Sequence, residues 1–112
     1  QRAGIVNAMD DMDFAAAVQA SGRKTIIVAG VTNDVCTVFP VLTLLEQGYE
    51  VVVVADAGGS PGKTGDELAL DRMRRAGATV LGTNQLLAGL AGDWSTAAGS
   101  EIVKILGAAL QA

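Results

Sequence analysis

The sequence contains no histidine and only one cysteine, Cys36. Without histidine this chain cannot supply a Ser-His or Cys-His catalytic pair, and most zinc sites are excluded as well. A single cysteine cannot form an internal disulfide, which favours a reducing, cytoplasmic location. It also leaves a free thiol whose role has to be explained.

Aromatic and basic residues are scarce too. Phe, Trp and Tyr make up 4% of the 112 residues, and the net charge is −4. With no basic stripe to neutralise phosphates, a nucleic-acid partner is not expected. No apolar run approaches the roughly 20 residues that span a bilayer, so no membrane segment is expected either. Half of the residues are apolar and mostly aliphatic, which suits strands buried in a parallel sheet of one domain or less.

Apolar periodicity and glycine stops predict alternating helices and strands after a loop over residues 1–9. Helices are expected near 11–21, 34–47 and 65–76, and strands near 25–30, 49–55 and 78–81. Asn84 or Thr83 is expected to cap a short helix, and Ser95 or Ser100 to start a last one. This αβαβαβα order predicts an α/β fold with a parallel sheet. The apolar stripe of the last helix would cover the domain's own sheet or, alternatively, dock on a neighbouring subunit.

Cys36 follows one of these predicted strands and opens the next helix. Asn33 and Asp34 are good N-cap residues, so we expect Cys36 in the first turn, where unpaired N–H groups stabilise a thiolate. Pro40 has no N–H to donate to the carbonyl of Cys36, which should loosen that turn. In open α/β sheets, ligands bind beyond the carboxyl ends of the strands. This position favours a nucleophile, and the alternative is a buried structural cysteine.

An oxyanion could be held at the same place. The unpaired N–H groups of that first turn, together with that of Thr32 or Val35, could stabilise the oxygen of a tetrahedral intermediate.

A second segment, Ala57–Thr64, resembles a phosphate-binding loop between a strand and a helix. It differs from the consensus only by Ala57 in place of the first glycine. Asp56, Asp66 and Glu67 lie where phosphates would bind, and their charge would repel them. A nucleotide site is therefore a weak alternative for this segment.

The most specific segment is Ala29-Gly30-Val31-Thr32-x-x-Val35-Cys36-x-x-Phe39-Pro40. Around it stand Arg2-x-Gly4-x-x-Asn7-Ala8-x-Asp10, Gly22-x-Lys24, Gly48-Tyr49, Asp56-Ala57 and Arg72-Met73-x-x-Ala76-Gly77-Ala78. Over about residues 1–94 this pattern resembles the C-terminal half of the isochorismatase-like cysteine hydrolases, and it is most similar to their YcaC-like branch of unassigned specificity.

The resemblance implies a three-layer α/β/α sandwich around a parallel sheet, here without its N-terminal strands. It implies a cysteine hydrolase that cleaves a small amide or related C–N bond through a thioester, with no metal or other cofactor. Cys36 would be the nucleophile, and the backbone N–H groups of Thr32 and Cys36 would form the oxyanion hole. The Val31–Thr32 bond would be a cis peptide, and Asn7 would lie near the substrate at the pocket rim.

The family's catalytic Asp and Lys have no counterpart in this sequence. Lys24 and Lys63 stand in other places, and Asp34 is expected to be a cap. Because the chain opens at Gln1 without an initiator Met, we expect residues 1–112 to be the C-terminal portion of a single domain. The Asp and Lys would then lie in a missing N-terminal part, whose absence leaves an apolar sheet edge unpaired. We expect a homo-oligomer, and the alternative function is a non-catalytic scaffold of the same fold.

Overall fold

A computed structural model describes residues 4–30, 32–93 and 95–111, with side chains described up to residue 105. Two compact units make up the chain, Gln1–Leu81 and Gly82–Ala112. The first contains Cys36 and all the strands found in the described ranges. None of the helices in the described ranges is long and apolar enough to cross a membrane.

The first unit is built on a three-stranded parallel sheet. Its strands, β1 (Thr25–Val28), β2 (Glu50–Val54) and β3 (Thr79–Leu81), lie in the order β1-β2-β3. Thr25 pairs with Glu50 in register, and Val53 pairs with Val80. The α/β class with a parallel sheet is therefore confirmed. Strand β1 lies at an edge, and Ile27 in it is 48% exposed.

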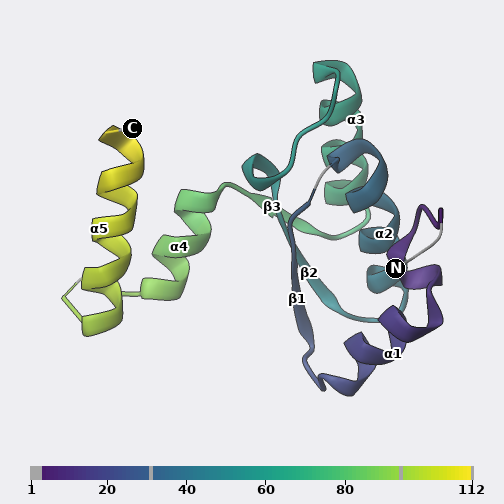
Figure 1. Ribbon diagram of the computed structural model, residues 1–112, viewed down its shortest axis with the longest axis horizontal. Coiled ribbons are helices and arrows are strands. Elements are labelled where there is room, and N and C mark those ends of the chain that lie inside the picture. Colours follow the sequence, from purple (N-terminus) through teal and green to yellow (C-terminus); the bar gives the residue numbers. More distant parts are fainter. Residues whose placement is uncertain (1–3, 31, 94, 112) are drawn as a thin grey trace. The chain divides into compact units, whose positions relative to one another are not determined.

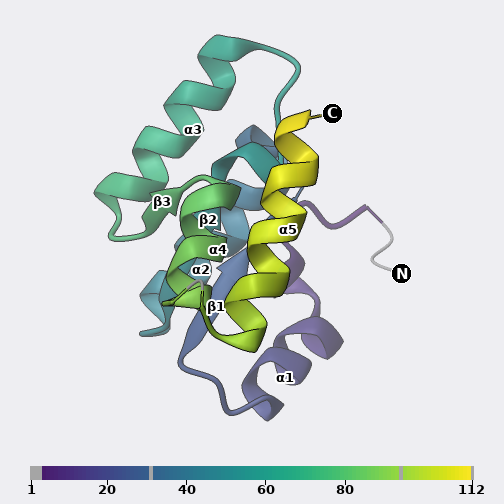
Figure 2. The ribbon, with the colours of Figure 1, turned by 90° about the vertical axis from the view of Figure 1, so that its left-hand side faces the viewer.

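Helices α1 (Met12–Ala20), α2 (Val38–Glu46) and α3 (Lys63–Arg75) lie on one side of this sheet (Figure 1). In the turned view, α1 lies near β1, and α3 lies near β3 (Figure 2). Between helices and sheet is an aliphatic core in which Val41, Val53 and Met73 have no exposed surface. The remaining core residues are Met9, Val38, Leu44, Val51, Ala69 and Ala78.

The predicted helix boundaries agree with the structure where local signals are strong. Asp11 caps α1, since its carboxylate accepts hydrogen bonds from the N–H groups of Asp13 and Phe14. Helices α2 and α3 end before Gly48 and Gly77, whose φ angles of 90° and 114° favour glycine. A short helical turn, Ala8–Asp10, replaces part of the loop expected over residues 1–9.

The second unit consists of α4 (Thr83–Ala91) and α5 (Ala97–Gln111), which pack on each other. Neither cap expected here is present. Gly82 precedes α4, so Asn84 and Thr83 are not its caps. Helix α5 starts after Thr96, rather than at Ser95 or Ser100, because the Thr96 hydroxyl accepts the N–H of Gly99 at 2.9 Å.

Candidate active site

Cys36 lies beyond the carboxyl end of β1, as expected, and its side chain is exposed. The alternative of a buried structural cysteine is therefore wrong. The thiol belongs to a π-helical turn, Asn33–Thr37, that leads directly into α2. In this turn the N–H of Thr37 donates to the carbonyl of Thr32 at 3.0 Å, and that of Val38 donates to the carbonyl of Asn33. Such π turns are rare and are frequent at functional sites.

The wide turn agrees with the loosening expected from Pro40. A proline at this place has no N–H for an α-type bond to Cys36 or for a π-type bond to Val35. Pro40 is itself buried, so its ring also fills space beneath the turn.

The expected capping by Asn33 and Asp34 is wrong. Thr32 is the N-cap residue, and it makes no side-chain capping bond. The fully buried Asn33 side chain instead donates to the carbonyl of Ala55 at 3.1 Å and to the Asp66 carboxylate at 2.9 Å. The turn is therefore held by tertiary contacts with the end of β2 and the start of α3.

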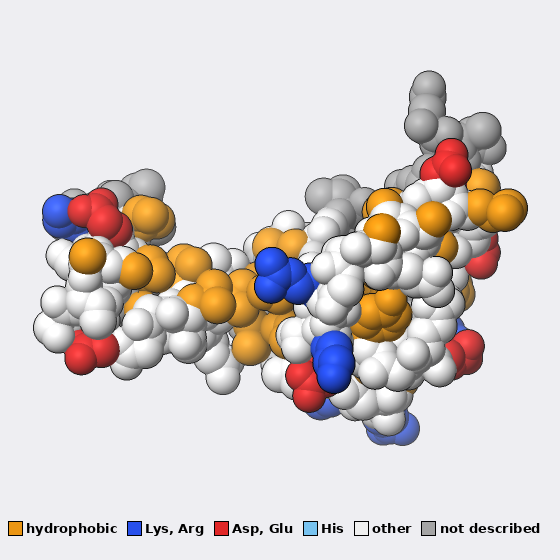
Figure 3. Space-filling view, turned by 90° about the horizontal axis from the view of Figure 1, so that it is seen from below, with side chains coloured by type: hydrophobic (Ala, Val, Ile, Leu, Met, Phe, Trp, Pro, Cys, Tyr) orange, Lys and Arg blue, Asp and Glu red, His pale blue; other side chains and the backbone are white. Residues whose placement is uncertain are grey.

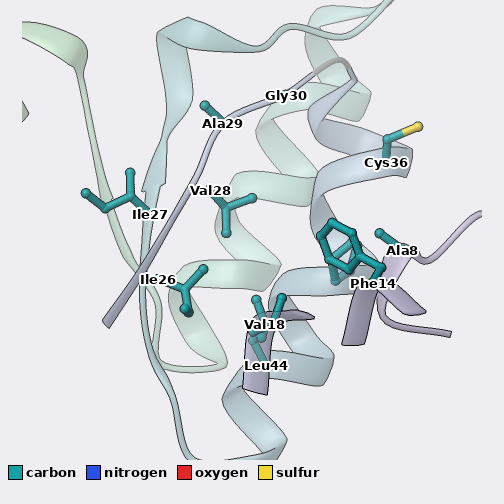
Figure 4. A pocket seen from close by; sticks show the side chains of 11 residues that line it. Ala8, Phe14, Val18, Ile26, Ile27, Val28, Ala29, Gly30, Cys36 and Leu44 are labelled. Carbon is teal, nitrogen blue, oxygen red and sulfur yellow. The ribbon is translucent and has the colours of Figure 1, made fainter. Parts of the chain in front are cut away.

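A pocket of about 350 Å³ lies between β1 and the helices, and Cys36 is part of its wall. This volume falls within the range of small-molecule sites. Most of its lining is apolar, and Ile26, Val28, Phe14 and Leu44 contribute to it. Figure 4 shows the Cys36 sulfur pointing away from β1, at the border of this pocket.

The structure describes the backbone at two of the candidate oxyanion donors, Val35 and Thr32. The Val35 N–H donates to the carbonyl of Thr32 at 3.4 Å, so it already has a partner within the turn. The backbone of Thr32 is extended, with φ −108° and ψ 157°. Val31 lies outside the described residues, and so does the predicted cis peptide at Val31–Thr32.

Asn7, which was predicted to lie near the substrate, makes hydrogen bonds within the fold, and its role at the pocket rim stays a prediction. Its amide donates to the Thr43 hydroxyl at 2.8 Å and to the carbonyl of Phe39 at 3.3 Å. Its side-chain oxygen accepts the N–H of Met9 at 2.9 Å. These bonds tie the N-terminal segment to α2 beside the pocket, and sequence reasoning did not anticipate them.

The Ala57–Thr64 segment packs against the Cys36 turn. The carbonyl of Gly59 accepts the N–H of Asn33 at 2.8 Å, and the Ser60 hydroxyl accepts that of Asp34 at 3.1 Å. A Cβ at Gly58 would collide with the Gly30 carbonyl and the Asn33 side chain. Glycine is required here by the close approach of two loops.

The two lysines considered for catalysis lie elsewhere. Lys24 precedes β1, whereas Cys36 follows it, so the two lie toward opposite ends of that strand. The Lys63 side chain is 90% exposed and lies 3.9 Å from the Glu67 carboxylate. Among the described residues, no three His, Cys, Asp or Glu side chains come together as metal ligands would. On the face in Figure 3, Lys and Arg side chains are scattered among apolar ones.

Residues 5–85 match the isochorismatase domain family. The chain is 41% identical to the probable hydrolase YcaC of Escherichia coli over 93 residues, which cover 83% of this chain and 45% of that protein. The chain thus spans about half the length of the curated relatives it matches.

Solved structures agree with this match. YcaC from Pseudomonas aeruginosa, with hexane-2,5-diol and covalent acrylamide, superimposes with a TM-score of 0.83 at 39% identity, over 89% of this chain and 50% of that one. The Escherichia coli YcaC structure, an octameric hydrolase of unknown specificity, has a TM-score of 0.81 at 34% identity. The match covers 96% of this chain and 58% of that one. A nicotinamidase pyrazinamidase from Acinetobacter baumanii has a TM-score of 0.58 at 26% identity, and the match covers 64% of this chain and 35% of that one.

Proposed function

The chain belongs to the isochorismatase family, in its YcaC-like branch, and we propose that it carries the nucleophile of a hydrolase that cleaves a small amide or related C–N bond. The observation that carries this proposal is the position of Cys36. Its thiol is exposed beyond the carboxyl end of β1, in a π turn at the border of an apolar pocket. Relatives described as hydrolases, and a nicotinamidase that acts on an amide, support the reaction class.

In the proposed reaction the Cys36 thiolate attacks the substrate carbonyl carbon. The N–H groups of Thr32 and Cys36 stabilise the oxyanion that forms. Collapse of this intermediate breaks the C–N bond, and the protonated amine or ammonia leaves. Water then hydrolyses the thioester to a carboxylic acid and restores the thiol. The covalent acrylamide in the Pseudomonas aeruginosa relative supports a reactive nucleophile in this branch, because acrylamide is an electrophile that thiols attack.

A general base and a lysine are needed to activate the thiol and the leaving group. We propose that residues 1–112 form the C-terminal portion of one catalytic domain, and that a preceding part supplies the Asp and the Lys. Two observations support this. The relatives are about twice as long as the matched region. On the side of β1 away from β2, no strand pairs with it within the described ranges, and its Ile27 is about half exposed.

We also propose a homo-oligomer, since the Escherichia coli relative is octameric. The single, unpaired cysteine supports a cytoplasmic location, where thiols stay reduced. Light scattering of the purified protein, coupled to size-exclusion chromatography, tests the assembly. A mass that stays at 11.3 kDa across concentrations would contradict it.

Thiol labelling tests the nucleophile. We expect iodoacetamide at pH 6–7 to alkylate Cys36 much faster than it alkylates free cysteine, whose thiol is mostly protonated there because its pKa is about 8.5. Peptide mass spectrometry should place the adduct on Cys36, and Cys36→Ser should take up none. The measurement should be made on this chain alone and on a fusion carrying the N-terminal portion of Escherichia coli YcaC. A rate no faster than that of free cysteine in both proteins would favour the scaffold alternative.

A further inference from the structure

The loop that resembles a phosphate-binding segment leads into the first turn of α3, where the Asp66 side chain contacts the Cys36 turn. Asp66, in the first turn of α3, accepts two hydrogen bonds on one carboxylate oxygen. One comes from the Asn33 amide at 2.9 Å, and the other comes from the Ser60 hydroxyl at 2.8 Å. We propose that Asp66 and Ser60 are positioning residues that hold the Cys36 turn in its reactive geometry. This inference rests on the proposed role of Cys36 as a nucleophile.

Asn33 is the first point of attachment. Its side chain has no exposed surface, and a buried amide is costly unless its N–H groups are paired. The two N–H groups of this amide have partners on different elements, the carbonyl of Ala55 after β2 and the carboxylate of Asp66. The bond to the carboxylate is charge-assisted and therefore among the stronger ones. Asn33 is thus fixed relative to both the sheet and α3.

Asp34 is the second point of attachment. Its backbone N–H donates to the Ser60 hydroxyl at 3.1 Å, and that hydroxyl donates its own proton to Asp66. The Ser60 hydroxyl therefore connects the Asp66 carboxylate to the backbone of the turn through two hydrogen bonds. Two successive residues of the π turn, Asn33 and Asp34, are held through the same oxygen of Asp66.

Cys36 depends on these attachments because its own side chain is exposed. It lies two residues after Asp34 in a five-residue turn, so rotation of Asn33 or Asp34 would redirect both its thiol and its N–H. A displacement of about 1 Å in a reacting group can lower a rate by about two orders of magnitude. Asp66 does not touch the thiol in this arrangement and acts only through the turn.

The test compares four variants of the full 112-residue chain by the rate of Cys36 alkylation by iodoacetamide from pH 6 to 9. Asp66→Ala removes both hydrogen bonds, whereas Asp66→Asn keeps an oxygen that can accept them. Ser60→Ala removes only the relay to Asp34. Glu67→Ala is the matched control, because the Glu67 side chain is exposed and its ion pair is with Lys63. Circular dichroism and thermal melting identify the variants that remain folded.

We expect Asp66→Ala to slow alkylation about tenfold at pH 7 and to change its pH profile, and Ser60→Ala to slow it about threefold. Asp66→Asn should recover most of the loss, and Glu67→Ala should match the wild type. Wild-type rates in folded Asp66→Ala overturn the inference. If Asp66→Ala does not fold, the test rests on Ser60→Ala. A wild-type rate of Cys36 alkylation in Ser60→Ala then overturns the inference. If wild-type Cys36 reacts no faster than free cysteine both in this chain and in the fusion with the N-terminal portion of Escherichia coli YcaC, the result would instead contradict the proposed function.

Discussion

Gly58 gives the sharpest stability test of how the Cys36 turn is packed. Its backbone lies so close to the neighbouring loop that a Cβ would collide with the Gly30 carbonyl oxygen and the Asn33 side chain. The carbonyl belongs to the backbone, and Asn33 is buried and hydrogen-bonded, so neither can move aside freely. We therefore expect Gly58→Ala to be strongly destabilising.

The size of the effect follows from the cost of overpacking. Forcing an extra methyl group into a well-packed site costs about 1–3 kcal/mol, and two immobile neighbours place this site in the upper half of that range. For a unit of this size, about 2–3 kcal/mol lowers the melting temperature by roughly 10–20 °C. The displaced Asn33 should also slow Cys36 alkylation, because the same turn carries the thiol.

Gly59→Ala is the matched control. It adds the same methyl group one residue later, where no atom lies within 4 Å and φ is not in the left-handed region. We expect its melting temperature to stay within about 2 °C of the wild type or to rise slightly, because alanine restricts the unfolded chain. Differential scanning calorimetry of both variants is the measurement. Equal melting temperatures for Gly58→Ala and Gly59→Ala would refute the close approach of the two loops.

Three further outcomes are expected. Met73→Ala should lower the free energy of unfolding by about 2–5 kcal/mol in urea titrations, because Met73 is fully buried. Leu68→Ala, on the exposed face of the same helix, should change the free energy of unfolding by under about 0.5 kcal/mol. Asp11→Ala should cost about 1 kcal/mol by removing the α1 cap, and a wild-type urea midpoint would contradict that role. Hydrogen bonds from the Ser95 side chain and backbone lower the pKa of Asp93 in the folded protein below its ordinary value of 3.8. The stabilisation of the fold by ionised Asp93 is therefore complete above pH 3.8, and it is lost as the pH falls through the lower pKa of the folded state. Asp93→Asn should remove this dependence of stability on pH. Acid titration of both proteins, monitored by the helical signal in circular dichroism, is the measurement.

The sequence was sufficient for the sheet and most helices because their signals are local. The four consecutive valines from Val51 to Val54 favour a buried strand, which is β2. Gly48 and Gly77 stop helices through backbone angles that other residues avoid. Asp11 caps α1 through its immediate neighbours, since it bonds to the N–H groups of Asp13 and Phe14. Each of these features depends on residues within about one helical turn.

The candidate site was predicted less completely, since it depends on contacts between distant segments. Asn33 looks like a cap in the sequence, yet it bonds to Asp66, 33 residues away. Asn7 alone looks like a turn residue in the sequence, and nothing near it indicates its bond to Thr43, 36 residues away. No periodicity or capping rule reports such partners. Cys36 could still be located, because a strand end and a helix start are both local features.

The resemblance of Ala57–Thr64 to a phosphate-binding loop has a physical explanation in this structure. Glycines in such a loop let a backbone approach something closely, and the pattern does not specify what is approached. Here Gly58 approaches the Gly30 carbonyl and the Asn33 side chain. The anion beside the loop is the protein's own Asp66 carboxylate, which binds the Asn33 amide and the Ser60 hydroxyl. The motif therefore indicated a real close contact, and the acidic residue that counted against a nucleotide is the group that holds the Cys36 turn.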